Sequence, residues 1–426
     1  MNVLLVVLDS VRAANCSLYG YRRTTTPALE SLADGATVYQ SARAPSNWSL
    51  PSHVSLFTGL ETNAHRVTIH DELDPGHTVW DDLSEAGYDT GLFTENGFVA
   101  DHPVGLSEPF DTVVSVPDDT PEQYLSGHHT DRPDGFYYAD RLCDWIDGRP
   151  EWAACLNLMD AHRPYDPAPE HDRWSSPQAH ELQSELPIRW EFDIHDGSYP
   201  VRRLDDLASL YDGGVRQADA VVESLLERLR RRGVFEETLL VVCGDHGEGF
   251  GESGRLPDQP PAVAHIVPMT ESLLHVPLVA KFPGQRTGRT VDDPAALTSF
   301  RDVVAAARGG ERASFARSRV VASKQPVTGD LRERYETAAD DATPFLRPSR
   351  AVYEPAETGV RKTYSWGDAV GEVHVPRAGT VGEAAAADRD RVSDAFDSLE
   401  NADVRSTDRD SVDERTRDQL DALGYF

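Results

Sequence analysis

Lysine is nearly absent from this sequence. Only three of its 41 basic side chains are lysines, at positions 281, 324 and 362, against 72 aspartates and glutamates. The formal net charge of −31 argues against binding to nucleic acid or to an anionic membrane surface, because these partners carry charge of the same sign. We therefore expect no nucleic-acid partner.

Cysteines and long apolar runs are also scarce. The four cysteines form no CxxC pair, which favours buried free thiols over a disulfide framework or a zinc site. No stretch approaches the ~18 apolar residues of a membrane span, and the first residues lack the basic region of a signal peptide. The acidic, Lys-poor composition resembles that of cytoplasmic proteins from extreme halophiles. We expect a halophilic, cytoplasmic protein without a membrane span.

Apolar runs alternate with helical patterns over the first 310 residues. The runs predict strands at 2–8, 37–42, 90–94, 152–159, 238–243 and 276–282, and helices at about 27–32, 79–86, 135–146 and 203–232. The last helix contains Gly213-Gly214, where we expect a break. Residues 163–200 are predicted to form an insertion over one face of the sheet. Continuous apolar strands separated by helices predict a doubly wound α/β sheet that is buried on both faces.

The pattern changes after about residue 310. Short strands are expected at 351–353, 360–366 and 371–375, followed by a flexible acidic linker at 377–410 and an amphipathic helix at 412–423. The aromatic end, Tyr425-Phe426, is expected to dock onto the body. These features divide the chain into a large α/β domain (1–310) and a small α+β unit (311–426).

The stretch 47–59 reads as a loop that turns directly into a helix. Pro51 suits a first helical turn, and Gly59 suits the residue that ends a helix. Ser49 then lies at the helix N-terminus, where free N–H groups favour an anion. Its hydroxyl is either a helix cap or a nucleophile.

Aspartates follow three of the predicted strands. Asp9, Asp160 and Asp245 each come directly after an apolar run, with His162 and His246 close by. Ligands of open α/β sheets gather at the carboxyl ends of the strands. Each aspartate taken alone also suits a cap of the next helix. Together, carboxylate and imidazole side chains suit one divalent ion: Mn²⁺, Mg²⁺, Ca²⁺ or Zn²⁺.

These motifs resemble the sulfatase family of the alkaline phosphatase superfamily. The matching segments are residues 2–10, Ser49-x-Pro51-Ser52 with Leu56-x-Thr58-Gly59, Asp160-x-His162-x-Pro164-Tyr165, Gly244-Asp245-His246-Gly247-Glu248, and His265 ahead of 275–278. The resemblance implies an alkaline-phosphatase-like three-layer sandwich with a mainly parallel central sheet. It also implies metal binding by Asp9, Asp245 and His246, a nucleophile at Ser49, and substrate contacts from His162 and His265.

Two positions depart from the family pattern. Members that oxidise Cys or Ser to formylglycine generally carry Arg four residues later, where this chain has His53. The family's first segment often reads Asp-x-x-Arg-x-Asp, and here Ala14 replaces its last residue. Formylglycine at Ser49 is therefore possible but not favoured.

The resemblance implies a metal-dependent hydrolase of sulfate or phosphate esters that forms a covalent intermediate on Ser49. His53 would assist the attack, and His162 or His265 would protonate the leaving alcohol. The expected substrate is an anionic small-molecule or glycan ester. Two alternatives stay open: a transferase that moves a phospho-head-group onto a glycan or lipid, and a catalytically silent relative that binds an anionic glycan.

Overall fold

A computed structural model describes residues 1–125, 127, 133–187, 190–265, 269–327, 329–376 and 381–406. The terminal helix predicted at 412–423 and the docking of Tyr425-Phe426 lie outside these residues. No helix among the described residues is long and apolar enough to cross a membrane.

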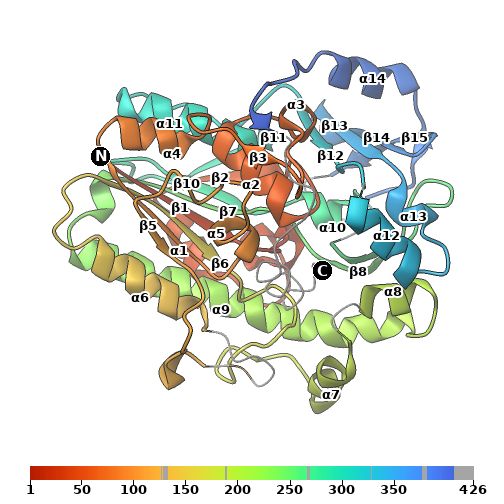
Figure 1. The fold of residues 1–426 in the computed structure, drawn as a ribbon, viewed down its shortest axis with the longest axis horizontal. Helices are drawn as coiled ribbons and strands as arrows, with labels where there is room; N and C mark the ends of the chain where they lie inside the picture. Colours follow the sequence, from red (N-terminus) through yellow and green to blue (C-terminus); the bar gives the residue numbers. More distant parts are fainter. Residues whose placement is uncertain are drawn as a thin grey trace.

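An eight-stranded sheet forms the centre of the molecule (Figure 1). Its strand order is β11-β2-β10-β7-β1-β6-β4-β5, and β10 alone runs antiparallel to its neighbours. β1 lies between β7 and β6, with Leu5 in register with Val241 on one side and Cys155 on the other. The strands are β1 (Asn2–Leu8), β2 (Thr37–Arg43), β4 (Asp89–Thr94), β5 (Thr112–Val114), β6 (Trp152–Leu158), β7 (Thr238–Gly244), β10 (Leu278–Lys281) and β11 (Arg289–Ala296).

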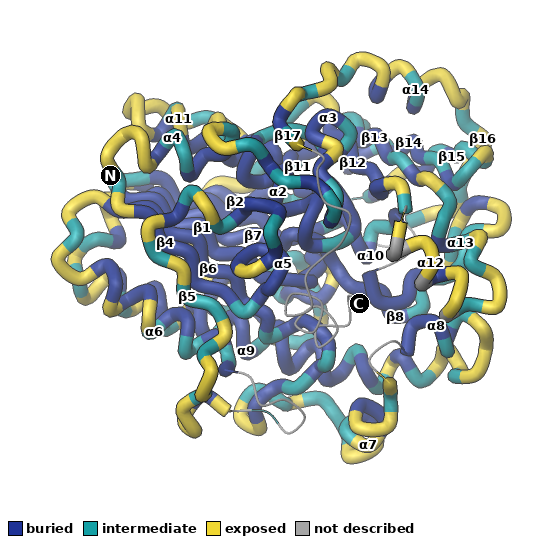
Figure 2. Tube along the Cα trace, viewed as in Figure 1, coloured by how far each residue is buried: buried dark blue, intermediate teal, exposed yellow. Residues whose placement is uncertain are grey.

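Helices cover both faces of this sheet, so the core has three layers (Figure 1). One face carries α1 (Pro27–Ala33), α6 (Gly135–Trp145) and α9 (Leu204–Arg231), and the other carries α2 (Ser49–Thr58), α4 (Val79–Glu85) and α11 (Phe300–Arg308). Every residue of the central strands β1, β6 and β7 and of α2 is buried (Figure 2). The α/β sheet covered on both faces, predicted from the apolar runs, and the mainly parallel three-layer sandwich implied by the family resemblance are both confirmed.

Helix α9 is continuous through Gly213-Gly214, and the predicted break is wrong. The two glycines serve a different purpose, because a loop crosses the helix at this point. A Cβ added at Gly214 would lie 2.3 Å from the carbonyl oxygen of Asp160, and one at Gly213 would lie 2.7 Å from Pro167. The glycines therefore allow the loop that carries His162 to lie directly on the helix.

A second, antiparallel sheet follows, with strand order β12-β13-β14-β15-β16. Its strands are β12 (Val320–Ser323), β13 (Ser349–Ala356), β14 (Gly359–Trp366), β15 (Ala369–Val375) and β16 (Ala385–Ala386). Side chains of both sheets contribute to one continuous buried cluster. The domain boundary at residue 310 stays a prediction.

The predicted flexible linker at 377–410 is wrong for residues 389–397, which form helix α14 (Arg389–Asp397). Val392, Ala395 and Phe396 share one face of this helix and pack against Val321 and Val352 of the small sheet. The acidic composition hid this apolar stripe, because charged residues fill the remaining positions. Further on, β17 (Arg405–Ser406) pairs with β3 (Glu72–Leu73) beside the main body.

The remaining elements are short. They are α3 (Thr62–His65), α5 (Gly97–Ala100), α7 (Pro177–Glu185), α8 (Trp190–His195), β8 (Gly249–Glu252), β9 (Ala262–Ala264), α10 (Glu271–Leu274), α12 (Gly329–Ala338) and α13 (Thr343–Leu346). Helices α7 and α8 lie within the predicted insertion at 163–200.

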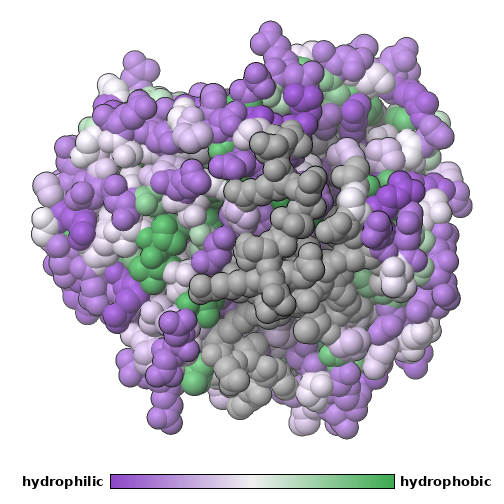
Figure 3. Space-filling model, in the orientation of Figure 1, coloured by the Kyte–Doolittle hydropathy of each residue, from purple (hydrophilic) through white to green (hydrophobic). Residues whose placement is uncertain are grey.

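All three lysines are buried. Lys281 donates to the carbonyl of Phe235 over 2.6 Å, Lys362 to that of Met269 over 2.7 Å, and Lys324 to that of Phe345. The basic side chains at the surface are therefore arginines. Most of the described residues visible in Figure 3 are hydrophilic. The four cysteines are free and buried, as predicted.

Candidate active site

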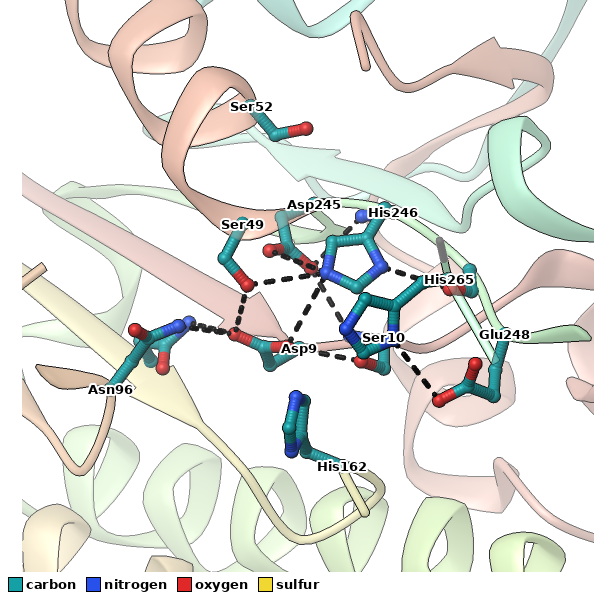
Figure 4. Close-up of polar contacts among 12 residues, drawn as sticks. Asp9, Ser10, Ser49, Ser52, Asn96, His162, Asp245, His246, Glu248 and His265 are labelled. Atoms are coloured by element: carbon teal, nitrogen blue, oxygen red, sulfur yellow. Dashed lines mark hydrogen bonds and ion pairs between the residues drawn. The ribbon is translucent and has the colours of Figure 1, made fainter. Parts of the chain in front are cut away.

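The carboxyl ends of β1 and β7 bring three buried side chains together (Figure 4). Asp9 follows β1, and Asp245 and His246 follow the neighbouring strand β7. One ligand atom from each of the three lies within 4.8 Å of the other two. The predicted metal-binding set is thus assembled in space by two adjacent parallel strands.

The donor atoms of Asp245 and His246 fit a divalent cation. The Oδ1 atom of Asp245 accepts the N–H groups of Ser10 (3.2 Å) and His246 (2.9 Å). Its buried Oδ2 accepts no hydrogen bond from the described residues and lies 3.5 Å from His246 Nε2. Because Nδ1 of His246 lies 2.9 Å from the carbonyl of Gly247, it carries the ring proton, and Nε2 presents a lone pair.

Hydrogen bonds also hold the carboxylate of Asp9 in place. Its Oδ2 accepts the side-chain amides of Asn96 (2.9 Å) and Asn157 (3.3 Å). Its Oδ1 accepts the hydroxyl of Ser10 (3.1 Å) and lies 3.7 Å from His246 Nε2. Ser10 thus donates to both carboxylates, from a left-handed backbone conformation with φ of 61°. One oxygen of each carboxylate is left facing the centre of the cluster.

Two glycines explain how the 244–248 segment fits into this space. A Cβ at Gly244 would lie 2.4 Å from the carbonyl oxygen of Val11, and one at Gly247 would lie 2.0 Å from that of Ser272. Larger residues would push Asp245 and His246 away from Asp9.

The buried negative charges of Asp9 and Asp245 would be stabilised by a nearby positive charge. Burial raises the pKa of Asp245, and the nearby charge of Asp9 raises it further. Burial also acts to raise the pKa of Asp9, but His162, His246 and His53 outweigh it and lower that pKa. Two buried carboxylates this close repel each other unless a cation lies between them.

Ser49 is the first residue of α2 and lies beside the cluster. Its hydroxyl lies 3.4 Å from Asp9 Oδ2 and 3.2 Å from His246 Nε2. All ten residues of the helix are buried, and Gly59 ends it with a φ of 77°. The loop-to-helix reading of 47–59 is confirmed, with Trp48 as the cap residue.

His53 lies one turn further along α2. Its Nδ1 is 2.9 Å from the backbone carbonyl of Ser49 and 3.6 Å from Asp245 Oδ2. Its Nε2 is 3.3 Å from the amide nitrogen of Asn157. The contact that the structure gives it with Ser49 is therefore to the backbone rather than the hydroxyl.

His265 and His162 complete the group of histidines around the cluster (Figure 4). The His265 ring lies 4.7 Å from that of His246 and 5.3 Å from that of His162. Its Nδ1 is 3.3 Å from Glu248 Oε2, whereas Nδ1 of His162 is 2.6 Å from the carbonyl of Arg163. Burial lowers the pKa of His162 to about 3 and also lowers that of His265, with a further contribution from His246.

Asp160, the third strand-end aspartate, does not join the cluster. Its Oδ1 accepts the backbone N–H of Gly135 (3.1 Å) and the side-chain amide of Gln217 (2.7 Å). It therefore fastens the 160–168 loop to α6 and α9. The same loop is tied to α8 by a buried ion pair between Arg163 and Glu191 (2.5 Å).

The sequence reading missed Ser10, Asn96 and Asn157. Asn157 carried a usable signal, since it is the one strongly polar side chain in the buried strand Trp152–Leu158. A polar side chain in such a strand needs a hydrogen-bond partner, which marks it as close to other polar groups. Asn96 lies in a loop between β4 and α5, where sequence gives no comparable contrast.

Comparisons with known proteins agree with this geometry. The sequence profile of the family described as Sulfatase matches residues 1–306, which hold the whole cluster. The chain is 28% identical over 135 residues to the low-salt glycan biosynthesis sulfotransferase Agl7 of Haloferax volcanii, covering 31% of this chain and 33% of that protein. It is 24% identical over 284 residues to human arylsulfatase A, covering 58% and 52% respectively. It thus spans between a third and about half of the length of these relatives.

Among solved structures, the phosphonate monoester hydrolase of Agrobacterium radiobacter superposes with a TM-score of 0.63. The match covers 88% of this chain and 89% of that one at 17% identity, which shows a shared fold. The family match, the parallel sheet and the strand-end cluster lead to one assignment. The chain belongs to the sulfatase family of the alkaline phosphatase superfamily.

Proposed function

We propose that this chain hydrolyses a sulfate or phosphate ester of a glycan or small molecule, with Ser49 as the nucleophile. The observation that carries the proposal is the position of the Ser49 hydroxyl, 3.4 Å from Asp9 and 3.2 Å from His246. The helix N-terminus at Ser49 also favours the anionic group of such an ester. The glycan is suggested by the relative Agl7, whose name places it in glycan biosynthesis.

Asp9, Asp245 and His246 would hold one divalent metal ion through the oxygens and the nitrogen that face each other. Such an ion, when bound, lowers the pKa of a nearby hydroxyl and withdraws charge from an ester oxygen. The amides of Asn96 and Asn157 and the hydroxyl of Ser10 keep the two carboxylates in place for it.

Ser49 then attacks sulfur or phosphorus, forming a bond from its Oγ while the bond to the alcohol oxygen breaks. Asp9 Oδ2 accepts the hydroxyl proton of Ser49 across the 3.4 Å contact. In a second step water attacks the sulfur or phosphorus and gives a proton to His265, while the bond to Ser49 Oγ breaks and Asp9 returns its proton to that oxygen. This restores the serine and releases sulfate or phosphate.

His265 is the better placed of the two histidines to protonate the leaving alcohol. Burial and the nearby charge of His246 lower the pKa of His265, and Glu248, which faces its Nδ1, opposes this shift, whereas Nδ1 of His162 faces a carbonyl. The negative charge of a bound ester also favours protonation of His265. We assign His162 to contact with the substrate, and His53 to holding the backbone of Ser49.

We further propose that Ser49 stays unmodified and that phosphorus is the preferred centre. The hydrate of formylglycine has a second hydroxyl that expels sulfate by elimination, whereas a plain serine must be freed by attack on the covalent ester. That attack is easier at phosphorus than at a sulfate monoester. His53, in place of the arginine of modified sites, agrees with this assignment.

A second candidate is transfer of the group to an acceptor alcohol in place of water. The name of Agl7, a sulfotransferase, favours it. Incubation with an ester donor and a glycan acceptor distinguishes the two, since transfer yields a substituted acceptor and hydrolysis yields free sulfate or phosphate.

The test is a panel of aryl sulfate, phosphate monoester and phosphodiester substrates, assayed with Mn²⁺, Mg²⁺, Ca²⁺ and Zn²⁺ in high salt. Ser49→Ala should abolish activity, and Ser49→Thr should keep part of it because a threonine hydroxyl can still attack. Ser52→Ala is the matched control: Ser52 lies on the same helix but points away from the cluster (Figure 4), toward the carbonyl of Ser46.

Intact-mass analysis of the same protein should show no loss of the two hydrogens that formylglycine formation removes. An aldehyde at position 49 together with aryl sulfate turnover would overturn the phosphorus assignment. Full activity in Ser49→Ala would overturn the nucleophile.

A further inference from the structure

Asn157 contacts two parts of the site at once. It lies near the end of β6 and is completely buried, in register with Val7 of β1 and with Thr94 of β4. Its side-chain nitrogen lies 3.3 Å from Asp9 Oδ2 and 3.3 Å from His53 Nε2. One amide group thus bridges a candidate metal ligand and the helix that carries Ser49.

The hydrogen bonds around Asn157 fix the orientation of its amide. Thr94 accepts the backbone N–H of Asn96 (2.8 Å), and its hydroxyl donates to Asn157 Oδ1 (2.9 Å). Nδ2 therefore faces Asp9 and His53, and each of its two hydrogens has an acceptor. The reverse orientation would place an amide oxygen against the Asp9 carboxylate.

This orientation assigns the protons of His53. Because Nε2 accepts from Asn157, the ring proton is on Nδ1, which points to the carbonyl of Ser49 at 2.9 Å. The result is a continuous chain of hydrogen bonds from Asp9 through Asn157 and His53 to the backbone of Ser49. Asn96 also donates to Asp9, but none of its described contacts involves His53.

We propose that Asn157 is a positioning residue that sets the metal ligand Asp9 and the nucleophile helix α2 at a fixed distance from each other. This rests on the proposed function, since it takes Asp9 as a ligand and Ser49 as the nucleophile. Displacement of a reacting group by 1 Å can cost about 10²-fold in rate. A rigid link between the two groups therefore acts on turnover as well as on metal binding.

The experiment measures Mn²⁺ affinity by titration, and kcat and KM on the best ester of the substrate panel at saturating Mn²⁺. Removing a residue that orients a metal ligand typically weakens metal binding about 10- to 100-fold. Asn157→Ala and Asn96→Ala should both show such a loss. At saturating Mn²⁺, Asn157→Ala should stay about 10- to 100-fold below the wild type in kcat with KM little changed. Its kcat should also stay below that of Asn96→Ala, which loses a donor to Asp9 but no contact with His53.

A double variant tests the path through His53. If Asn157 acts on Ser49 through His53, the loss in kcat of Asn157→Ala with His53→Ala should be smaller than the product of the two single losses. Asn157→Leu serves as a second variant, since it keeps roughly the size of the side chain and adds no charge beside Asp9 but loses both donors. Melting curves without metal check that each variant folds.

The proposal is wrong if Asn157→Ala binds Mn²⁺ within twofold of the wild type, or if its kcat matches that of Asn96→Ala at saturating Mn²⁺. Failure of both Asn157 variants to fold would show a purely structural role and would also count against it. Asp245→Ala separates this result from the proposed function. Retained Mn²⁺ binding in Asp245→Ala would contradict the metal centre itself, whereas loss of Mn²⁺ there with full binding in the Asn157 variants would contradict only the positioning role.

Discussion

The buried ion pair between Arg163 and Glu191 offers a quantitative test of how the His162 loop is held. The side chains are 3% and 1% exposed, and their charged atoms lie 2.5 Å apart. With charge centres ~4 Å apart and an effective dielectric constant of about 20, their attraction is about 4 kcal/mol. Breaking a buried pair typically costs about 3–5 kcal/mol, because the remaining charge stays buried without its partner.

Glu191→Gln removes the charge but keeps the shape and one acceptor oxygen. We therefore expect a loss of about 3 kcal/mol in the free energy of unfolding, near the lower end of that range. Equilibrium unfolding in urea, followed by circular dichroism, measures it. The loss should persist in molar salt, because buried pairs are screened much less than exposed ones.

Glu336→Gln is the matched control. Glu336 pairs with Arg332 on the surface of α12 at 2.8 Å, with both side chains about half exposed. Such a pair contributes at most about 0.5 kcal/mol. Equal losses in the two variants, or a loss below about 1 kcal/mol in Glu191→Gln, would refute the reasoning from burial.

Three further predictions follow from other parts of the molecule. Asp245→Ala should stay folded yet lose Mn²⁺ in equilibrium dialysis, and full occupancy would contradict the metal assignment. The melting temperature should climb from low salt into the molar range, because salt screens the self-repulsion of a chain with net charge −31; a flat or falling curve would remove the halophile reading. Burial lowers the pKa of Lys324 from 10.5 to about 7, so the folded state releases a proton that the unfolded state keeps. Stability should therefore rise relative to Lys324→Met by about 1.4 kcal/mol per pH unit between pH 7 and 10 in urea titrations, and parallel curves would contradict it.

Six of the eight strands of the main sheet and the cluster of Asp9, Asp245 and His246 could be predicted from the sequence, because they depend on local patterns. The edge strands β5 and β11 were not predicted, since neither is a continuous apolar run. Asp9 and Asp245 directly follow apolar strands, and adjacent parallel strands must bring such residues to one edge. Gly59 and Pro51 likewise mark the ends of α2 through their own backbone preferences.

Other parts of the site depend on contacts that no local pattern contains. Asn157 reaches Asp9 only because β6 pairs with β1 in one particular register. Gly213-Gly214 suggested a helix break because glycine disfavours helices. The loop that requires these glycines lies about 50 residues earlier in the chain, so the local sequence does not reveal it. Asp160 follows an apolar strand just as Asp9 does, but its carboxylate is hydrogen-bonded to Gln217 of α9 and does not lie in the cluster.

The burial of all three lysines makes this chain unusual as a substrate for amine chemistry. Reagents that acylate or cross-link lysine find no such side chain at the surface of the folded protein, so immobilisation or labelling must use other groups. Each lysine becomes reactive only when its surroundings open: Lys281 reports on β10 of the main sheet, and Lys324 and Lys362 report on the small sheet. The rate of lysine modification at each position, read by peptide mass, thus measures how often each sheet opens in the native state.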